Sequence, residues 1–335
     1  MSQKNDDFSA YVSKITNMQQ DLHTALEFID FRNIVRKDSV VFVKPNFTFP
    51  RYKEGVTTSP RLLSCLLKIL KDRADRVIVG ESDGGNKSFS AKEAFEGHDM
   101  LDIARDTGAE LVNLSDLPRS TVEDNIQGKK VSVQLPNLLL NEVDCVVSVP
   151  VLKVHVITGV SLSMKNLWGC YPDTMRCLHH KHLDYKLGLM TKRLNPRMVV
   201  IDGTYSLDEH GPMYGTPRET NLILASNNAV VADALGSEIM AIPLKVASHI
   251  LIAERENLGT TDLTRVRMNS GIDSYRLKFG IKKTLLDRVS VLLFNSEFLA
   301  KTVMDSGMTP IIYKAAGRLR TSREQSVALE LERHY

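Results

Sequence analysis

The sequence predicts an α/β fold with a doubly wound, mostly parallel sheet, formed as two lobes with the site between them and followed by a helical C-terminal extension. Short β-branched runs alternate along the chain with segments of helical periodicity. The runs are continuously apolar, which is typical of strands buried on both faces. We expect a core over residues 1–270, with a site loop at 150–182, and an extension over 271–335.

The first strand and helix are the clearest elements. Ser39 to Lys44 is a β-branched strand, and Ser59 to Lys71 carries leucines at helical spacing with Ser59 as N-cap and Pro60 as the first helical residue. Further strands are predicted over 76–80, 110–114, 143–149, 198–202 and 221–225, with an antiparallel strand over 130–135. Helices are predicted over 100–107, 178–189, 229–241, 281–293 and 299–304.

Composition indicates an ordinary globular enzyme. Of 335 residues, 43% are hydrophobic and 25% charged, and the net charge is +3. The even charge balance and the aromatic content of 6% argue against nucleic acid as a partner. A polar amino terminus, the lack of any apolar run of about 18 residues, and four cysteines without Cys-x-x-Cys spacing predict a cytoplasmic protein with no transmembrane segment.

The segment after the strand at 143–149 concentrates reactive side chains. Ligands of α/β proteins collect at the carboxyl ends of strands, and His155, Lys165 and Asn166 follow this one closely. An imidazole titrates near neutrality, so we expect His155 to move protons. Lys165 lies in a largely apolar run, where it would hold an anion or become nucleophilic through desolvation. The alternatives are a hydrogen-bonded loop histidine and a surface lysine.

Other polar residues follow predicted strands. Lys44 and Asn46 end the first strand, and with Lys153 we expect them to bind an anionic substrate. Asp202 ends a buried strand and is expected to bind substrate or to complete a metal site. A turn with a solvated lysine is the alternative at Lys44.

Histidines cluster after the central motif. His179 and His182 lie three residues apart, on one face if that segment is helical, and an i, i+3 pair can share a metal. His180 projects about 100° away from them. A solvated basic face is an equal alternative for this cluster.

Several separated motifs resemble the family catalogued as domain of unknown function 362, over about Val40 to Gly259. The motifs are Lys44-Pro45-Asn46, Pro150-x-x-Lys153-x-His155, Lys165-Asn166-x-x-Gly169, Lys181-His182, Asp202-Gly203, Gly211-Pro212-x-x-Gly215-x-Pro217 and Ala232-Asp233-Ala234. Many members carry a ferredoxin-like cysteine segment. This chain lacks those cysteine clusters, so we expect no iron–sulfur cluster.

The ten-residue interval from His155 to Lys165 is also distantly similar to the pattern of nickel-pincer lactate racemase. That resemblance implies that Lys165 carries a pyridinium-derived cofactor covalently and that His155 is an acid or base. His180 or His182 falls near the position of the nickel ligand, so the resemblance implies a transition metal there.

These observations predict a cytoplasmic enzyme, racemase- or epimerase-like or a metal-dependent oxidoreductase. It would act on a small carboxylate by proton or hydride transfer with a metal or a lysine-bound cofactor. The alternatives are a transferase for a phosphorylated or nucleotide-linked substrate, and a noncatalytic ligand- or metal-binding module. The C-terminal helices would make a homodimer.

Overall fold

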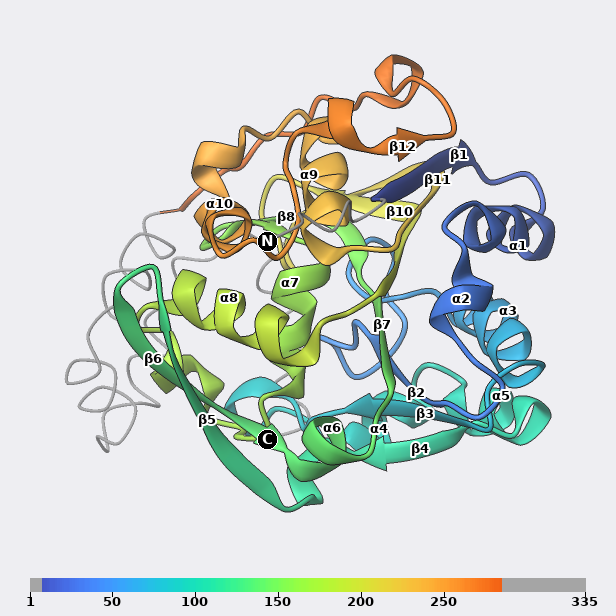
Figure 1. Cartoon of the computed structure of the whole chain (residues 1–335), viewed down its shortest axis with the longest axis vertical. Helices are drawn as coiled ribbons and strands as arrows, with labels where there is room; N and C mark the ends of the chain where they lie inside the picture. Colours follow the sequence, from blue (N-terminus) through green and yellow to red (C-terminus); the bar gives the residue numbers. More distant parts are fainter. Residues whose placement is uncertain (1–7, 285–335) are drawn as a thin grey trace, which may run out of the picture.

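A ten-stranded sheet runs through the computed structural model, which describes residues 8–284 (Figure 1). Five neighbouring strands, counted from the edge strand β4 inward, are parallel, in the order β4, β3, β2, β7, β10. Their bounds are β2 Val40–Pro45, β3 Arg76–Glu81, β4 Glu110–Asn113, β7 Cys145–Val149 and β10 Met198–Asp208. The mostly parallel α/β sheet is as the sequence predicts.

The strand order contains a topological switch point. From β2 the chain adds β3 and β4 on one side, then returns to place β7 and β10 on the other side. In open α/β sheets ligands bind outside the carboxyl ends of the strands at such a point. The fold therefore places its natural binding crevice at the ends of β2 and β7.

Antiparallel strands extend the sheet beyond β10. β11 (Thr216–Ser226) pairs with β10, β1 (Ser9–Lys14) pairs with β11, and β12 (Arg267–Met268) runs parallel to β1. After Pro150 the chain of β7 continues into β8 (Val151–His155), which pairs with both β10 and the short β9 (Gly159–Ser161). A separate two-stranded ribbon is formed by β5 (Arg119–Ile126) and β6 (Lys129–Pro136).

Helices cover both faces of the sheet (Figure 1). Side chains alternate along a strand, so Val41 and Val43 pack on one face and Phe42 on the other. The first face carries α1 (Met18–Phe28), α2 (Phe31–Ile34), α3 (Pro60–Lys71), α4 (Ala91–Glu96) and α5 (Met100–Thr107). The second carries α6 (Asn137–Asn141), α7 (Ser163–Asn166), α8 (Leu183–Leu194), α9 (Ala229–Ile239) and α10 (Ser248–Arg255). This arrangement is the predicted doubly wound fold.

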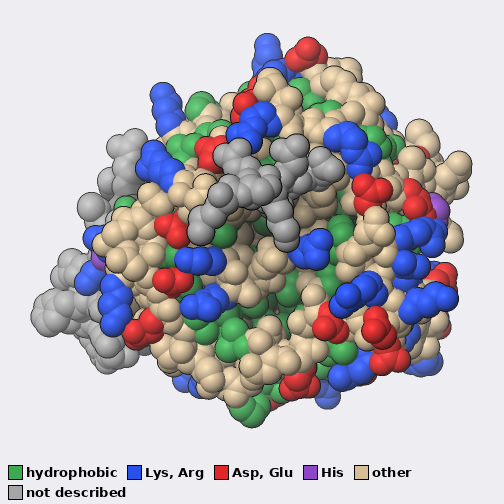
Figure 2. All heavy atoms as spheres, in the orientation of Figure 1, with side chains coloured by type: hydrophobic (Ala, Val, Ile, Leu, Met, Phe, Trp, Pro, Cys, Tyr) green, Lys and Arg blue, Asp and Glu red, His purple; other side chains and the backbone are tan. Residues whose placement is uncertain are grey.

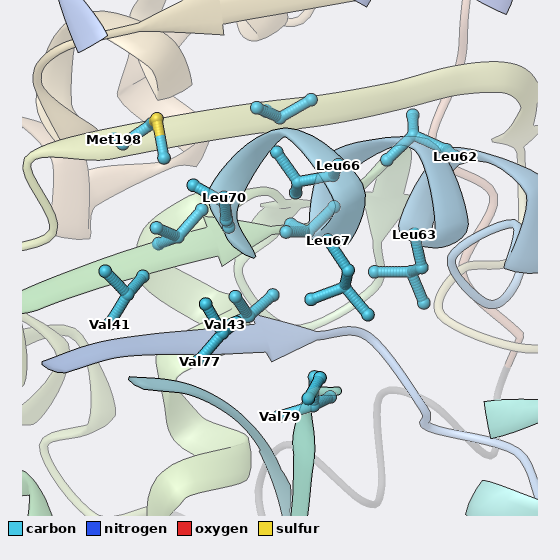
Figure 3. Close-up of a cluster of buried hydrophobic side chains, with 14 of the residues drawn as sticks. Val41, Val43, Leu62, Leu63, Leu66, Leu67, Leu70, Val77, Val79 and Met198 are labelled. Carbon is cyan, nitrogen blue, oxygen red and sulfur yellow. The ribbon is translucent and has the colours of Figure 1, made fainter. Parts of the chain in front are cut away.

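The core of the first face is built on α3 (Figure 3). Its leucines at helical spacing are all buried, and they pack with valines of β2 and β3. Ser59 occupies the N-cap position and Pro60 begins the helix, as the sequence predicts. Fully burying one such leucine stabilises the fold by roughly 1.5–3 kcal/mol.

The predicted helix over 178–189 is wrong in its first half. A 3₁₀ turn spans Arg176–His179, and α8 begins only at Leu183. His182 lies between them with a left-handed φ of 59°, which no helix tolerates in its interior. His179 and His182 therefore do not share a helical face.

The C-terminal extension lies mainly outside the described residues. Of the helices predicted over 281–293 and 299–304, only residues 281–284 fall inside, so the extension and the homodimer stay predictions. Within residues 8–284, none of the helices combines the length and the apolar character needed to cross a membrane. Acidic and basic side chains are intermixed on the face seen in Figure 2.

A buried carboxylate on α9 fixes the start of α7. The Asp233 oxygens accept hydrogen bonds from the backbone N–H groups of Ser163 at 2.7 Å and Met164 at 3.0 Å. Burial raises the pKa of Asp233 to about 7, against the lowering effect of these two donors. Because α7 carries Lys165 and Asn166, this anchor sets the position of both.

We expect Leu66→Ala to lower the free energy of unfolding by about 2–5 kcal/mol, because it opens a cavity against the valines of β2 and β3. Urea denaturation measures the change. Leu101→Ala on α5 is the control, since Leu101 is 48% exposed and its truncation should cost far less. Equal losses for the two variants would contradict the assignment of α3 to the core.

We expect Asp233→Asn to lower the free energy of unfolding by roughly 1–3 kcal/mol, because the amide N–H₂ would face a backbone N–H that now has an acceptor. The same denaturation experiment serves, with Asp106→Asn at an exposed position as the control. Unchanged stability in Asp233→Asn would show that the carboxylate does not anchor α7.

Candidate functional site

A small pocket of about 120 Å³ opens at the carboxyl ends of β2, β3 and β8. This is the switch point, where the strand order predicts a ligand. Its polar lining includes Lys44, Asn46, Glu81, Lys153, His155, Lys165, Asn166 and Arg176. Six of these were predicted from the sequence, and the fold brings the six together from three segments, 44–46, 153–155 and 165–166.

Lys44 is neutralised inside the protein. Its Nζ, on a side chain only 1% exposed, lies 2.7 Å from Glu81 Oε2 and donates also to the Pro45 carbonyl. Glu81 further accepts from the backbone N–H groups of Phe47 and Ser82. A Cβ on Gly169 would lie 2.8 Å from Lys44 Nζ, so the glycine makes room for this pair. Glu81 ends β3, and its role is not evident from the sequence beyond its oxygen-rich turn.

Lys153 is fully buried without a carboxylate. Its Nζ donates to the Val56 carbonyl at 2.6 Å and to Asn46 Oδ1 at 3.1 Å. Burial, with Lys165 and Lys44 nearby, holds the pKa of Lys153 well below its usual range. A buried ammonium without a counter-ion is costly, so the neutral amine is favoured.

His155 presents a hydrogen-bond donor to the pocket. Its Nδ1 lies 3.0 Å from the backbone N of Ile157 and 3.4 Å from that of Thr158, and a backbone N–H can only donate. Burial and neighbouring cations, Lys165 first, hold the pKa of His155 well below its usual range. The neutral ring therefore carries its proton on Nε2, which suits His155 to bind an acceptor rather than to remove a proton.

Lys165 is a pocket amine with a lowered pKa. It is partly buried, and burial together with Arg176 lowers the pKa of Lys165 to about 8. Among the described residues its Nζ has neither a hydrogen bond nor an ion pair. At neutral pH about one tenth of such amines are unprotonated.

Asn166 ties the pocket together. Its Nδ2 donates to the Lys44 carbonyl at 2.9 Å and to Ser148 Oγ at 3.3 Å, which joins α7 to β2 and β7. It lines the pocket, and its amide N–H₂ is already engaged. Asn166 thus holds β2 and β7 together at the switch point.

Arg176 is a pocket residue that sequence reasoning missed. Its guanidinium donates to the carbonyls of Tyr171 and Asp83 and lines the pocket. Burial lowers the pKa of Arg176. Acidic neighbours oppose this shift, and Glu81 has the largest effect among them. A single arginine in an irregular segment belongs to no sequence motif. The sequence indicates Arg176 only by placing it inside the predicted site loop.

Asp202 lies outside the pocket lining. Its oxygens accept from the backbone N–H groups of Ser59 at 2.7 Å and Thr204 at 2.9 Å. Because Ser59 is the N-cap residue of α3, Asp202 joins the start of that helix to β10. The carboxylate holds the scaffold, and its substrate-binding role stays a prediction.

The histidines proposed as metal ligands do not converge. His180 packs near Trp168, with ring centroids 5.8 Å apart, and burial and Lys165 lower the pKa of His180 to about 3. His182 packs edge-on against Tyr185 at the start of α8. Within the described residues, no three His, Cys, Asp or Glu side chains form a group able to hold a metal ion. The donor set does not fit nickel or another transition metal.

The nearby cysteines are buried thiols. Burial raises the pKa of Cys170 to about 12 and that of Cys177 to about 11, so neither is a thiolate near neutral pH in the metal-free protein. The Cys177 Sγ lies 3.0 Å from Asn86 Oδ1. His249 on α10, not anticipated from the sequence, lies fully buried, and Lys165 contributes to lowering its pKa to about 3.

Comparison with known proteins gives the family of the chain. A thylakoid-associated protein of Synechocystis sp. is 25% identical over 235 residues, which cover 68% of this chain and 70% of that protein. No solved structure is significantly similar to the chain. A family model described as Domain of unknown function (DUF362) matches residues 41–238. Since this match spans more than half of the 335 residues and contains most of the pocket, the chain belongs to that family.

Proposed function

We propose that this protein is an enzyme that binds a small carboxylate and exchanges a proton on the carbon next to it, as a racemase or epimerase does. The observation that supports this most is Lys165: an amine with a pKa of about 8, in a small pocket, without a hydrogen-bonded or ion-paired partner among the described residues. General bases work best when their pKa lies near the working pH.

The other pocket groups suit a carboxylate. Arg176 and the His155 Nε2–H supply donors, and the Lys44–Glu81 pair keeps Lys44 from competing as a free cation. The pocket, of about 120 Å³, opens to solvent and would take up the reacting end of a small acid.

In the proposed step the neutral Lys165 amine takes a proton from the carbon beside the carboxylate. The C–H bond breaks, its proton bonds to Nζ, and the electron pair moves onto the carboxylate oxygens. Arg176 and His155 donate hydrogen bonds to the developing charge. Return of a proton from Nζ to the same face completes the exchange with retention, and a proton delivered from water to the opposite face inverts the carbon.

The cytoplasm is part of this proposal. All four cysteines are free thiols, the state expected in a reducing compartment. The related protein is named for its association with thylakoids, so a membrane-associated location is the competing proposal. Fractionation of the native host decides between them.

The proposal predicts α-carbon exchange that depends on Lys165. Short 2-hydroxy and 2-amino acids would be incubated with the protein in D₂O, and proton NMR would follow loss of the α-hydrogen signal. Lys165→Met should lower the exchange rate by about 10²–10⁴-fold, because the base is removed. Lys92→Met, on a side chain that is 81% exposed, is the control and should keep the rate. Full exchange in Lys165→Met would exclude it as the base.

The same assay predicts a rising pH profile. Because the amine must be neutral to accept a proton, exchange should fall tenfold per pH unit below about 8 and level off above it. Lys165→Arg should keep carboxylate binding and lose exchange, since a guanidinium stays protonated. Binding without exchange in the wild type at every pH would instead identify a noncatalytic binding module.

A further inference from the structure

Two lysines, Lys44 near the end of β2 and Lys153 in the middle of β8, are buried in different ways. Lys44 faces the carboxylate of Glu81 at 2.7 Å, whereas Lys153 has two neutral carbonyl oxygens as its hydrogen-bond partners. Both side chains are almost inaccessible to solvent, and both line the pocket. Lys44 therefore has a counter-ion inside the protein, and Lys153 has none among the described residues.

The hydrogen-bond count at Lys153 matches a neutral amine. A neutral amine has two N–H donors and one lone pair, and the two oxygens of Val56 and Asn46 accept two donors. An ammonium would have a third N–H with no acceptor among the described residues. Lys153 lines the pocket, so an anion that enters the pocket comes close to an amine that has no carboxylate partner among the described residues.

The charged groups around Lys153 support the same state. Lys44 and Lys165 are the cations that act on it, and His155 lies two residues further along β8. On the paired strand β10, Asp202 is engaged by Ser59 and Thr204, and Asp208 pairs with Arg218. Glu81 is engaged by Lys44. The described surroundings thus supply positive charge and no spare carboxylate.

We propose that Lys153 is a neutral amine in the free protein and takes up one proton when a carboxylate occupies the pocket. The entering carboxylate is the counter-ion that the site lacks, and it accepts the third N–H of the ammonium that forms. This inference rests on the proposed carboxylate binding and makes Lys153 a group that selects for anions. It also makes carboxylate affinity fall as pH rises.

Titration calorimetry with oxalate tests the proposal. Oxalate is small and planar, like the species formed when a proton leaves the carbon next to a carboxylate, and it stays fully ionised near neutral pH. Runs in Tris and in triethanolamine, two cationic buffers with different ionisation enthalpies, give the number of protons taken up. We expect net uptake in the wild type near neutral pH, where most Lys165 is already protonated.

Two variants assign the proton. The Lys153→Met variant should bind oxalate more weakly, and its binding should no longer include the proton that Lys153 takes up. The Lys165→Met variant should still take up a proton when it binds oxalate. Thermal melting confirms that each variant is folded, and Lys153→Gln serves if the methionine variant is not. Independently of any variant, log Kd for wild-type oxalate binding should rise by about one per pH unit where Lys153 is neutral when free and charged when bound.

The outcomes separate the two proposals. Absence of oxalate binding to the wild type would overturn carboxylate binding, and this inference with it. Binding without proton uptake, or uptake that persists undiminished in folded Lys153→Met or Lys153→Gln, would overturn this inference alone. If proton uptake disappears in Lys165→Met but not in the Lys153 variants, the proton belongs to Lys165. That result would also overturn the inference about Lys153.

Discussion

The site depends on burying several cationic side chains where parallel strands end. Charge removed from water is expensive unless it is paired, and the protein meets this cost differently for each group. Glu81 pairs with Lys44, while Lys153 is held by carbonyl oxygens and Lys165 keeps partial access to solvent. The lysines lie close together because the strand order places Lys44 of β2 and Lys153 of β8 at the same switch point. A reactive amine is the chemical consequence of that placement.

The surrounding scaffold is built to hold these side chains closely. Gly169 leaves space beside the Lys44–Glu81 pair, and a Cβ on Gly211 would come within 1.8 Å of the Val154 carbonyl on β8. Asp233 fixes the first turn of α7, and Asp202 fixes the start of α3. The glycines and aspartates of the family motifs thus act mainly on backbone geometry, and the lysines that they position line the pocket. Replacing Asp233 or Asp202 would therefore act on the pocket through the backbone, by loosening the start of α7 or α3.

The sequence predicted the parts of this structure that local pattern controls. The leucine spacing predicts α3, and the continuous apolar runs predict the strands of the sheet. The ends of the predicted strands indicate Lys44, Asn46 and Lys153 as pocket residues. Arg176 and His249 were missed because their positions depend on packing between segments far apart in the chain. The histidine cluster failed as a helical pair because His182 adopts a left-handed conformation that periodicity cannot reveal. The sequence did not indicate that Asp202, inside β10, joins this strand to the start of α3, and its substrate-binding role stays a prediction.

The hydrogen-bond balance of the pocket limits its chemistry. Glu81 already accepts from Lys44, Phe47 and Ser82, Asn46 Oδ1 accepts from Lys153, and His155 Nδ1 accepts from two backbone amides. Each of these three side chains thus already accepts from the protein, whereas His155 Nε2 and the Lys165 amine remain as donors for a ligand. A ligand rich in donors would leave polar groups unmatched on both sides, at a cost of about 1–3 kcal/mol for each. An ionised carboxylate, which only accepts, satisfies the pocket without that cost.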